Sequence, residues 1–222
     1  MRIAVLTFDG FNEIDSFVAA YLINRLRRPG WKAEITCPAD HVESGNGVRV
    51  RAQQPLEFAR EADAVIVGSG RLTRQIAEDA AIMSRIALDP ARQLIGSQCS
   101  GALILAKLGL LASLPACTDR SSRPMVEETG VRVLDQSFFA SGNLATAGGC
   151  LSGHYLATWM IWRLAGRAAA EEALTYIMPV GEEEQYITRA IDTVAPFIGA
   201  DVRSGAERRE ASSGSSGQIA SR

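Results

Sequence analysis

The sequence predicts an α/β protein in which helices cover both faces of a mainly parallel sheet. Short apolar runs typical of buried strands alternate with longer stretches of helical pattern along most of the chain. Three of these runs end in small-residue turns, TFDG, VGSG and SQCSG, as strands at a ligand-binding sheet edge do. The chain has 222 residues, of which 47% are hydrophobic and 22% charged, and this suits one domain.

The first half of the chain supplies an expected strand, a helix and two further strands. Residues 2–7, RIAVLT, form an apolar run that DGF ends. The stretch that follows carries apolar residues at helical spacing and stops at RRPG. A second strand is expected at KAEITC (32–37), and the alternation in NGVRVRA (46–52) predicts an edge hairpin strand. The apolar residues expected on the first helix are Ile14, Phe17, Val18, Tyr21 and Leu22.

The second half repeats the alternation and ends in helices. DAVIVGSG predicts a strand that runs into glycines and is followed by a helix through Ile76, Met83 and Ile86. QLIGS predicts the next strand and GALILAKLGLL its helix. The remaining expected elements are a hairpin over 131–149 with its turn at 141–143, a helix from about Leu151 to Leu164, and a helix across 168–178.

We therefore expect one folded domain at 1–199 and a flexible polar tail at 200–222, where the sequence is small, polar and without periodicity. The net charge of −2, without a block of basic residues, predicts no nucleic-acid or membrane partner. Four cysteines without a CxxC pair, and a strand pattern at the N-terminus with no signal peptide expected, predict reduced thiols and a cytoplasmic location. With only two histidines, we expect no metal and no cofactor.

The sequence SQCSG places Cys99 between a strand and a helix, with Ser97 and Gly101 at its flanks. A nucleophile elbow has this pattern, because small neighbours let the chain fold back sharply. The helix start would favour the thiolate and lower the pKa of Cys99, and the Ser100 amide would face a developing negative charge. The alternative is an ordinary buried cysteine that packs as a small hydrophobe.

The segment SQCSGALILAKLGLL resembles the nucleophile segment of the ThiJ/PfpI superfamily, whose members have a class I glutamine amidotransferase-like, flavodoxin-like three-layer fold. VLTFDGFNEID is similar to the first strand and loop of that family, and DAVIVGSG to its glycine loop. GNLATAGGCLSGHYLATWMIWRLAG is similar to its closing strand and helix. The resemblance covers residues 2 to about 180, and the FDG…ID opening is most similar to the isonitrile hydratase branch.

The resemblance implies that Cys99 is the nucleophile and that Asp15 is a carboxyl group beside its sulfur. It also implies that Gly70 and Ser100 donate backbone N–H groups and that Ser69 lies in the glycine loop. Without the resemblance, Asp15 would be read as a helix cap or a first-turn partner of the helix dipole.

The sequence departs from the family pattern around the expected pocket. Asp119 stands in ACTDRSS where many relatives have a histidine, so a Cys–His dyad lacks its usual partner. His154 stands where relatives often have aspartate, and a structural hydrogen bond at a helix start is its alternative role. Cys150 either lines the pocket or packs at the last helix.

The function implied is a cofactor-independent lyase or hydrolase that hydrates a small electrophilic molecule through Cys99, with isonitrile hydratase as its nearest example, in a homodimer. The alternatives are a redox or stress sensor that oxidises at Cys99, a glyoxalase- or deglycase-like enzyme, and a binding module.

Overall fold

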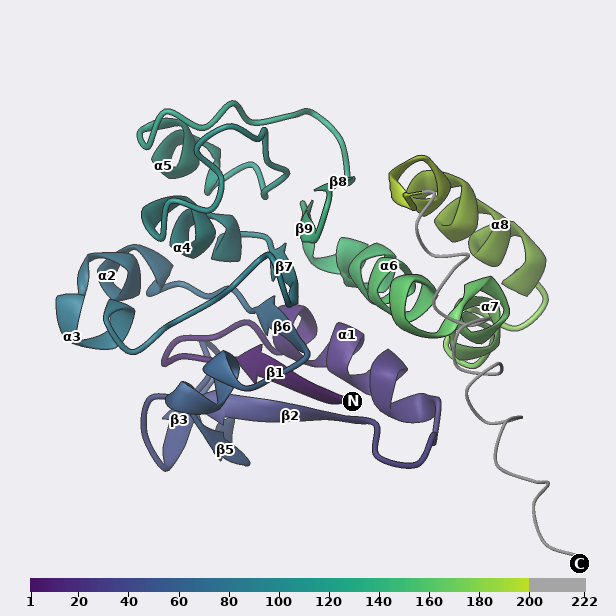
Figure 1. Ribbon diagram of the computed structural model, residues 1–222, viewed down its shortest axis with the longest axis horizontal. Helices are drawn as coiled ribbons and strands as arrows, with labels where there is room; N and C mark the ends of the chain where they lie inside the picture. Colours follow the sequence, from purple (N-terminus) through teal and green to yellow (C-terminus); the bar gives the residue numbers. More distant parts are fainter. Residues whose placement is uncertain (200–222) are drawn as a thin grey trace, which may run out of the picture.

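A seven-stranded sheet forms the centre of this computed structural model, which describes residues 1–199 (Figure 1). The strand order is β5-β2-β1-β6-β7-β9-β8, and only β8 runs antiparallel to its neighbour. The expected tail, 200–222, lies outside the described residues. The strands are β1 (Arg2–Leu6), β2 (Lys32–Cys37), β5 (Gln54–Pro55), β6 (Ala64–Val67), β7 (Leu94–Gln98), β8 (Phe138–Ser141) and β9 (Leu144–Ala147).

Both expected hairpins are present. In the main sheet, β8 and β9 pair antiparallel, with Ser141 opposite Leu144 at the predicted turn. Separately, β3 (His41–Glu43) and β4 (Arg49–Arg51) form a two-stranded sheet, so the alternating stretch 46–52 contributes a short hairpin strand, as predicted.

Helices cover both faces of the sheet (Figure 1). One face packs against α1 (Glu13–Arg25), α6 (Gly153–Ala165), α7 (Arg167–Thr175) and α8 (Glu183–Val194). The other face packs against α2 (Thr73–Glu78), α4 (Gly101–Lys107), α5 (Arg123–Glu127) and the 3₁₀ turn η1 (Leu56–Arg60). The remaining short elements are α3 (Ala80–Met83), η2 (Cys150–Ser152) and η3 (Ala195–Phe197).

The central strands supply alternate residues to the two cores, as strands buried on both faces must. In β1, Ile3 and Val5 face the α1–α6 side, whereas Ala4 and Leu6 face the α2–α4 side. The fully buried Trp159 of α6 is the largest side chain in the first core. The expected three-layer α/β sandwich with a flavodoxin-like, mainly parallel sheet is confirmed.

Two expected helices are shorter than the sequence pattern suggested. The stretch through Ile76 and Met83 is divided at Asp79, whose extended backbone ends α2 and whose carboxylate caps α3 by accepting from the amides of Ala81 and Ile82. The helix expected over 101–111 ends at Lys107, and Gly109 follows with a positive φ of 76°. Local capping chemistry therefore overrides the apolar periodicity.

The predicted buried face of α1 is also only partly correct. Leu22 is buried as expected, but Ile14 and Tyr21 are 44% and 47% exposed. The inward face of α1 instead uses small and polar residues, including Asp15. Helix α8 was not predicted at all, although Ala190, Ile191 and Val194 give it a buried face.

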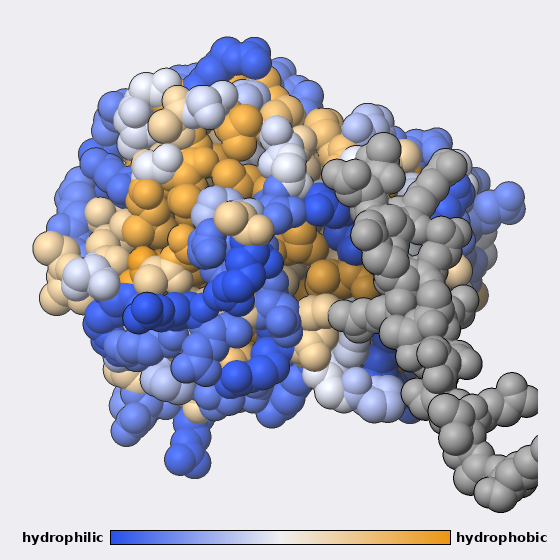
Figure 2. Space-filling model, in the orientation of Figure 1, coloured by the Kyte–Doolittle hydropathy of each residue, from blue (hydrophilic) through white to orange (hydrophobic). Residues whose placement is uncertain are grey.

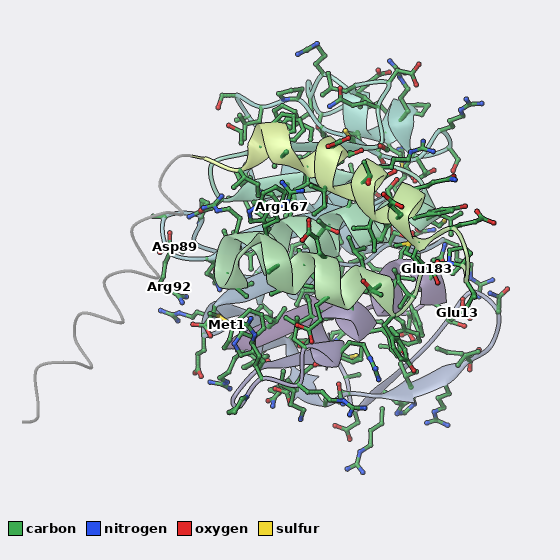
Figure 3. The ribbon with its side chains drawn as sticks, turned by 90° about the vertical axis from the view of Figure 1, so that its right-hand side faces the viewer. Met1, Glu13, Asp89, Arg92, Arg167 and Glu183 are labelled. Atoms are coloured by element: carbon green, nitrogen blue, oxygen red, sulfur yellow. The ribbon has the colours of Figure 1, made fainter. Side chains whose placement is uncertain are left out.

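The functional edge of the sheet is the one at which the parallel strands end. The order β2-β1-β6-β7 reverses direction between β1 and β6, and such switch points open a crevice beyond the strand ends. Figure 3 shows Met1, Asp89 and Arg92 toward one end of the molecule and Glu13, which follows β1, toward the other. The view of Figure 2 shows hydrophobic residues near the centre of one face and hydrophilic residues around them.

Candidate active site

Cys99 occupies a strained turn between β7 and α4. Its φ is +47°, and among the described residues only Arg27 is another non-glycine residue with positive φ. This conformation costs on the order of 1–3 kcal/mol, so the surrounding structure must hold it. The Cys99 amide donates to the Ala147 carbonyl at 2.8 Å, and the Thr118 hydroxyl donates to the Cys99 carbonyl at 2.8 Å. The expected elbow geometry is present.

Gly101 allows the chain to turn back after Cys99. A Cβ at this position would lie 2.5 Å from the Val67 carbonyl oxygen and 2.7 Å from that of Gly68. Only glycine therefore fits where α4 begins against the end of β6. The Ser100 amide makes no hydrogen bond with any of residues 1–199, as is usual for the first amides of a helix.

Asp15 points inward from the first turn of α1 and is 1% exposed. The helix cap is Asn12, whose side chain accepts from the Ile14 amide at 3.1 Å, so Asp15 is not needed as a cap. The Ser69 hydroxyl donates to one carboxylate oxygen of Asp15, and the other oxygen, Oδ1, has no hydrogen-bond partner among the described residues. A carboxylate oxygen of Asp15 and the sulfurs of Cys99 and Cys150 all lie within 4.8 Å of one another.

This environment raises the pKa of Cys99 above its ordinary value. Burial of the sulfur is the largest cause, followed by the charge of Asp15 and a hydrogen bond to it, with smaller contributions from Cys150 and Asp119. The prediction that the helix start would lower the pKa of Cys99 is therefore wrong, because burial of the sulfur and the nearby charge of Asp15 outweigh the dipole of a short helix. The raised pKa means that the Cys99 thiol keeps its proton.

Cys150 lies beside Cys99, with its sulfur among the converging Asp15, Cys99 and Cys150 atoms. It starts η2 directly after β9 and Gly149, and its sulfur accepts from the Asn12 side-chain amide at 3.2 Å. Burial, followed by the charge of Asp15 and a hydrogen bond to it, raises the pKa of Cys150.

Gln98, which sequence reasoning missed, joins the two cysteine segments. Its Nε2 donates to the carbonyls of Gly149 at 2.8 Å and Cys150 at 3.3 Å, and lies 3.8 Å from the Cys99 sulfur. The residue is fully buried, and its Oε1 has no partner within residues 1–199. A polar residue at the end of an otherwise apolar strand was the available signal.

The glycine loop supports the site, but not in the way expected for Gly70. The Gly70 N–H donates to the Thr73 hydroxyl at 3.0 Å and to the Ser100 hydroxyl at 3.2 Å. The two hydroxyls are 2.8 Å apart. The Gly70 amide is thus engaged within the protein, whereas Ser69 reaches the site through its bond to Asp15.

Asp119 and His154 have different surroundings. Burial alone would raise the pKa of Asp119, but hydrogen bonds from Ser121 and Ser122 outweigh it and hold the pKa low. Asp119 therefore presents a negative charge toward Cys99.

His154 lies at the start of α6 and contacts the Leu151 carbonyl through Nδ1. Burial, together with the charge of Arg189, lowers the pKa of His154. The other histidine, His41, contacts Arg49. These contacts give neither imidazole a link to the Cys99 sulfur.

Asp15, Cys99 and Cys150 are also the residues that a metal ion would use. Within residues 1–199 they are the only group of three or more such side chains with converging ligand atoms. One carboxylate and two thiolates suit a thiolate-preferring divalent ion, although binding would require both thiols to lose their protons.

None of the helices in the described part of the chain combines the length and apolar character of a membrane span. A sequence comparison with curated proteins gives no significant match.

Solved structures give many matches. A ThiJ/PfpI family protein from Pseudomonas syringae is 25% identical, with a TM-score of 0.71 over 88% of this chain and 86% of the other. DJ-1 of Schizosaccharomyces pombe is 19% identical, with a TM-score of 0.69 over 81% of this chain and all of the other. An oxidised DJ-1 of Toxoplasma gondii is 18% identical, with a TM-score of 0.69 over 81% of this chain and 98% of the other. A model of the DJ-1/PfpI family matches residues 1–161, and the chain therefore belongs to that family.

Proposed function

We propose that this protein is a cysteine-dependent enzyme that adds water to a small uncharged electrophile, with an isonitrile as the model substrate. The observation that carries the proposal is the buried Asp15 carboxylate beside the protonated Cys99 sulfur. A nucleophile and a proton carrier in contact are what thiol addition to a carbon–nitrogen multiple bond requires.

The first step forms a carbon–sulfur bond. Asp15 takes the Cys99 proton while the sulfur attacks the terminal carbon of the isonitrile, and the carboxyl then returns that proton to the same carbon. The product is a thioimidate, R–N=CH–S–Cys99. The Ser69 hydroxyl, which donates to Asp15, keeps the carboxylate oriented toward the sulfur.

The second step consumes water. Water adds to the thioimidate carbon, the carbon–sulfur bond breaks, and the sulfur recovers its proton. The balance is one isonitrile and one water converted to one N-substituted formamide. The Ser100 amide, unpaired within residues 1–199, offers a donor at the elbow.

The site favours this acid-assisted chemistry over a protease-type reaction. A Cys–His mechanism needs an imidazole at the sulfur, and the two histidines of the chain contact Arg49 and Leu151 instead. Because Cys99 is 3% exposed, small reactants are favoured over a peptide.

The test is to incubate the protein with small alkyl and aryl isonitriles and measure formamide by mass spectrometry or NMR. We expect turnover in the wild type, none in Cys99→Ala, and a loss of at least about 100-fold in Asp15→Asn, since a positioned proton carrier contributes at least this much. Cys117→Ala serves as the control, because Cys117 is not one of the converging residues, and it should keep its turnover. Formamide production that survives Cys99→Ala, or its absence in the wild type, would reject the proposal.

A second candidate is redox sensing without turnover. The observation that favours it is again the Asp15 carboxyl, which is placed to accept a hydrogen bond from the O–H group of a Cys99 sulfenic acid, and one structural neighbour is an oxidised DJ-1. A sensor would gain oxygen at Cys99 in proportion to added peroxide and would convert no isonitrile. A hydratase would show the turnover described above.

A further inference from the structure

The site contains a second thiol that the hydration chemistry does not use. The sulfurs of Cys150 and Cys99 lie within 4.8 Å of each other, and both are free thiols. The other two cysteines have separate environments: Cys37 packs with Phe11 and Val42, and the Cys117 amide donates to the Thr146 hydroxyl. Cys150 is therefore the thiol placed to meet Cys99.

Two side chains hold Cys150 in this position. Gln98, the residue before Cys99, donates through Nε2 to the carbonyls of Gly149 and Cys150 and so ties the two segments together. Asn12 donates through its side-chain amide to the Cys150 sulfur at 3.2 Å. Because both contacts are made at the cysteine pair itself, they keep the two sulfurs close together.

We propose that Cys99 and Cys150 form a reversible disulfide when a hydroperoxide oxidises Cys99. In the first step Asp15 takes the Cys99 proton while the sulfur attacks one peroxide oxygen and the O–O bond breaks; the leaving oxygen receives that proton, so that Cys99 sulfenic acid and an alcohol or water result. In the second step the Cys150 sulfur attacks the Cys99 sulfur, the S–O bond breaks, and hydroxide leaves with the Cys150 proton as water. The peroxide is reduced by two electrons, which the two thiols supply.

The local geometry permits the bond. A disulfide needs sulfurs about 2.05 Å apart, so the pair must close by at most about 2.8 Å. Cys150 follows Gly148 and Gly149, and Gly149 has a φ of +87° with no atom closer than 3.9 Å to an added Cβ. Rotation about χ1 of either cysteine can supply this movement.

Asp15 fits the second step as well as the hydration chemistry. Its carboxylate contacts both sulfurs, so it can accept the proton of Cys150 and pass it to the leaving hydroxide. The disulfide would block Cys99 as a nucleophile but, unlike sulfinic acid, would be reversed by a thiol reductant. This inference goes beyond the proposed hydration and does not depend on it.

The experiment uses the full chain, reduced and treated with a metal chelator, then exposed to graded hydrogen peroxide. The protein is unfolded, alkylated with iodoacetamide and digested, and the peptides are analysed by mass spectrometry. We expect loss of two of the four thiols, a cross-linked peptide pair containing Cys99 and Cys150, and recovery of both thiols with dithiothreitol.

The variants separate this reaction from simple oxidation. In Cys150→Ser, and in Cys150→Ala if the serine variant does not fold, the cross-link is absent and Cys99 gains oxygen that dithiothreitol does not remove. Cys117→Ala, which changes a buried cysteine outside the site, keeps the cross-link. Gln98→Ala slows cross-linking because the glycine turn loses its tie to Cys99.

Three results would overturn the proposal: irreversible oxygen gain at Cys99 in the wild type with Cys150 still alkylated, a cross-link through Cys37 or Cys117, or no oxidation of Cys99. The readout is thiol content and peptide mass, which need no substrate. An enzyme that fails to convert isonitriles can therefore still form the disulfide, and an active hydratase can fail to form it.

Discussion

The Asp15 carboxylate and the Cys99 sulfur lie within 4.8 Å of each other, although one residue comes from the segment after β1 and the other from the turn after β7. Parallel strands bring these segments together because their carboxyl ends share one edge of the sheet. The pair is buried, with exposures of 1% and 3%, so water does little to screen the effect of the Asp15 charge on the Cys99 thiol.

Removing the charge of Asp15 should make Cys99 more reactive toward alkylation and less able to catalyse hydration. Burial and the Asp15 charge both raise the pKa of Cys99, so Asp15→Asn lowers that pKa and increases the thiolate fraction at a given pH. We expect the iodoacetamide rate at pH 8 to rise, by about tenfold for each unit by which the pKa of Cys99 falls, because the thiolate fraction of a weakly ionised thiol changes in that proportion.

The pH profile of Cys99 alkylation, followed by peptide mass analysis, provides the measurement. Asp119→Asn is the matched control, because Asp119 is the last of the contributors to the raised pKa of Cys99 and its removal should shift the profile less. Superimposable profiles for the wild type and Asp15→Asn would show that the carboxylate does not act on the sulfur.

Cys117 should make the stability of the protein depend on alkaline pH. Burial raises the pKa of Cys117 to about 12, against hydrogen bonds that lower it. The folded protein keeps this proton between about pH 9 and 12, whereas the unfolded chain loses it, so the contribution to stability is present below that window and declines as pH rises through it.

The measurement is urea unfolding of the reduced wild type and Cys117→Ala at pH 8 and pH 10. Cys117→Ala loses buried packing at both pH values. The difference in the free energy of unfolding between the wild type and this variant should nevertheless be smaller at pH 10. A difference that stays constant or grows would contradict the raised pKa of Cys117.

At position 99, a glycine variant should be more stable than an alanine variant, which reverses the usual order. Glycine ordinarily destabilises relative to alanine by about 0.5–1 kcal/mol, because it loses more backbone freedom on folding. At φ +47° the Cβ costs about 1–2 kcal/mol, so Cys99→Gly should be more stable than Cys99→Ala by up to about 1 kcal/mol. Thermal or urea unfolding of the two variants decides the order, and a more stable alanine variant would mean that the elbow is not strained.

The sequence predicted most of the strands, the elbow and its family, because these depend on short local patterns, but it did not predict the short strands β3 and β5. SQCSG contains both the small flanks and the glycine that the turn at Cys99 requires, and the strand at 94–98 carries the apolar run. The resemblance also placed Asp15 near the sulfur, which no local pattern could do, since Asp15 has the position of an ordinary first-turn carboxylate.

The remaining features depend on contacts between distant segments. The thiol of Cys150 and the amide of Gln98 meet only when β7 and β9 pair, and the raised pKa of Cys99 follows from burial that a sequence does not display. In α1, Ile14 is exposed while its neighbour Asp15 is buried, because the first turn directs the carboxylate inward. Periodicity identifies a helix more readily than it identifies which face is buried.

The two glycines that begin helices α4 and α6 should respond differently to alanine. At Gly101 a Cβ would lie 2.5 Å from the backbone oxygen of Val67, and neither backbone segment can move without disturbing β6 or the Cys99 turn. Gly101→Ala should therefore reduce the free energy of unfolding by roughly 1–3 kcal/mol and slow or abolish reactions of Cys99.

At Gly153 a Cβ would meet Val18 at 3.5 Å, an ordinary contact, and the backbone is already helical. Gly153→Ala should be neutral or stabilise by up to about 1 kcal/mol through the unfolded state. Urea unfolding and Cys99 alkylation of both variants provide the comparison, and equal losses of stability would show that the close approach of α4 to β6 does not set the geometry of the elbow.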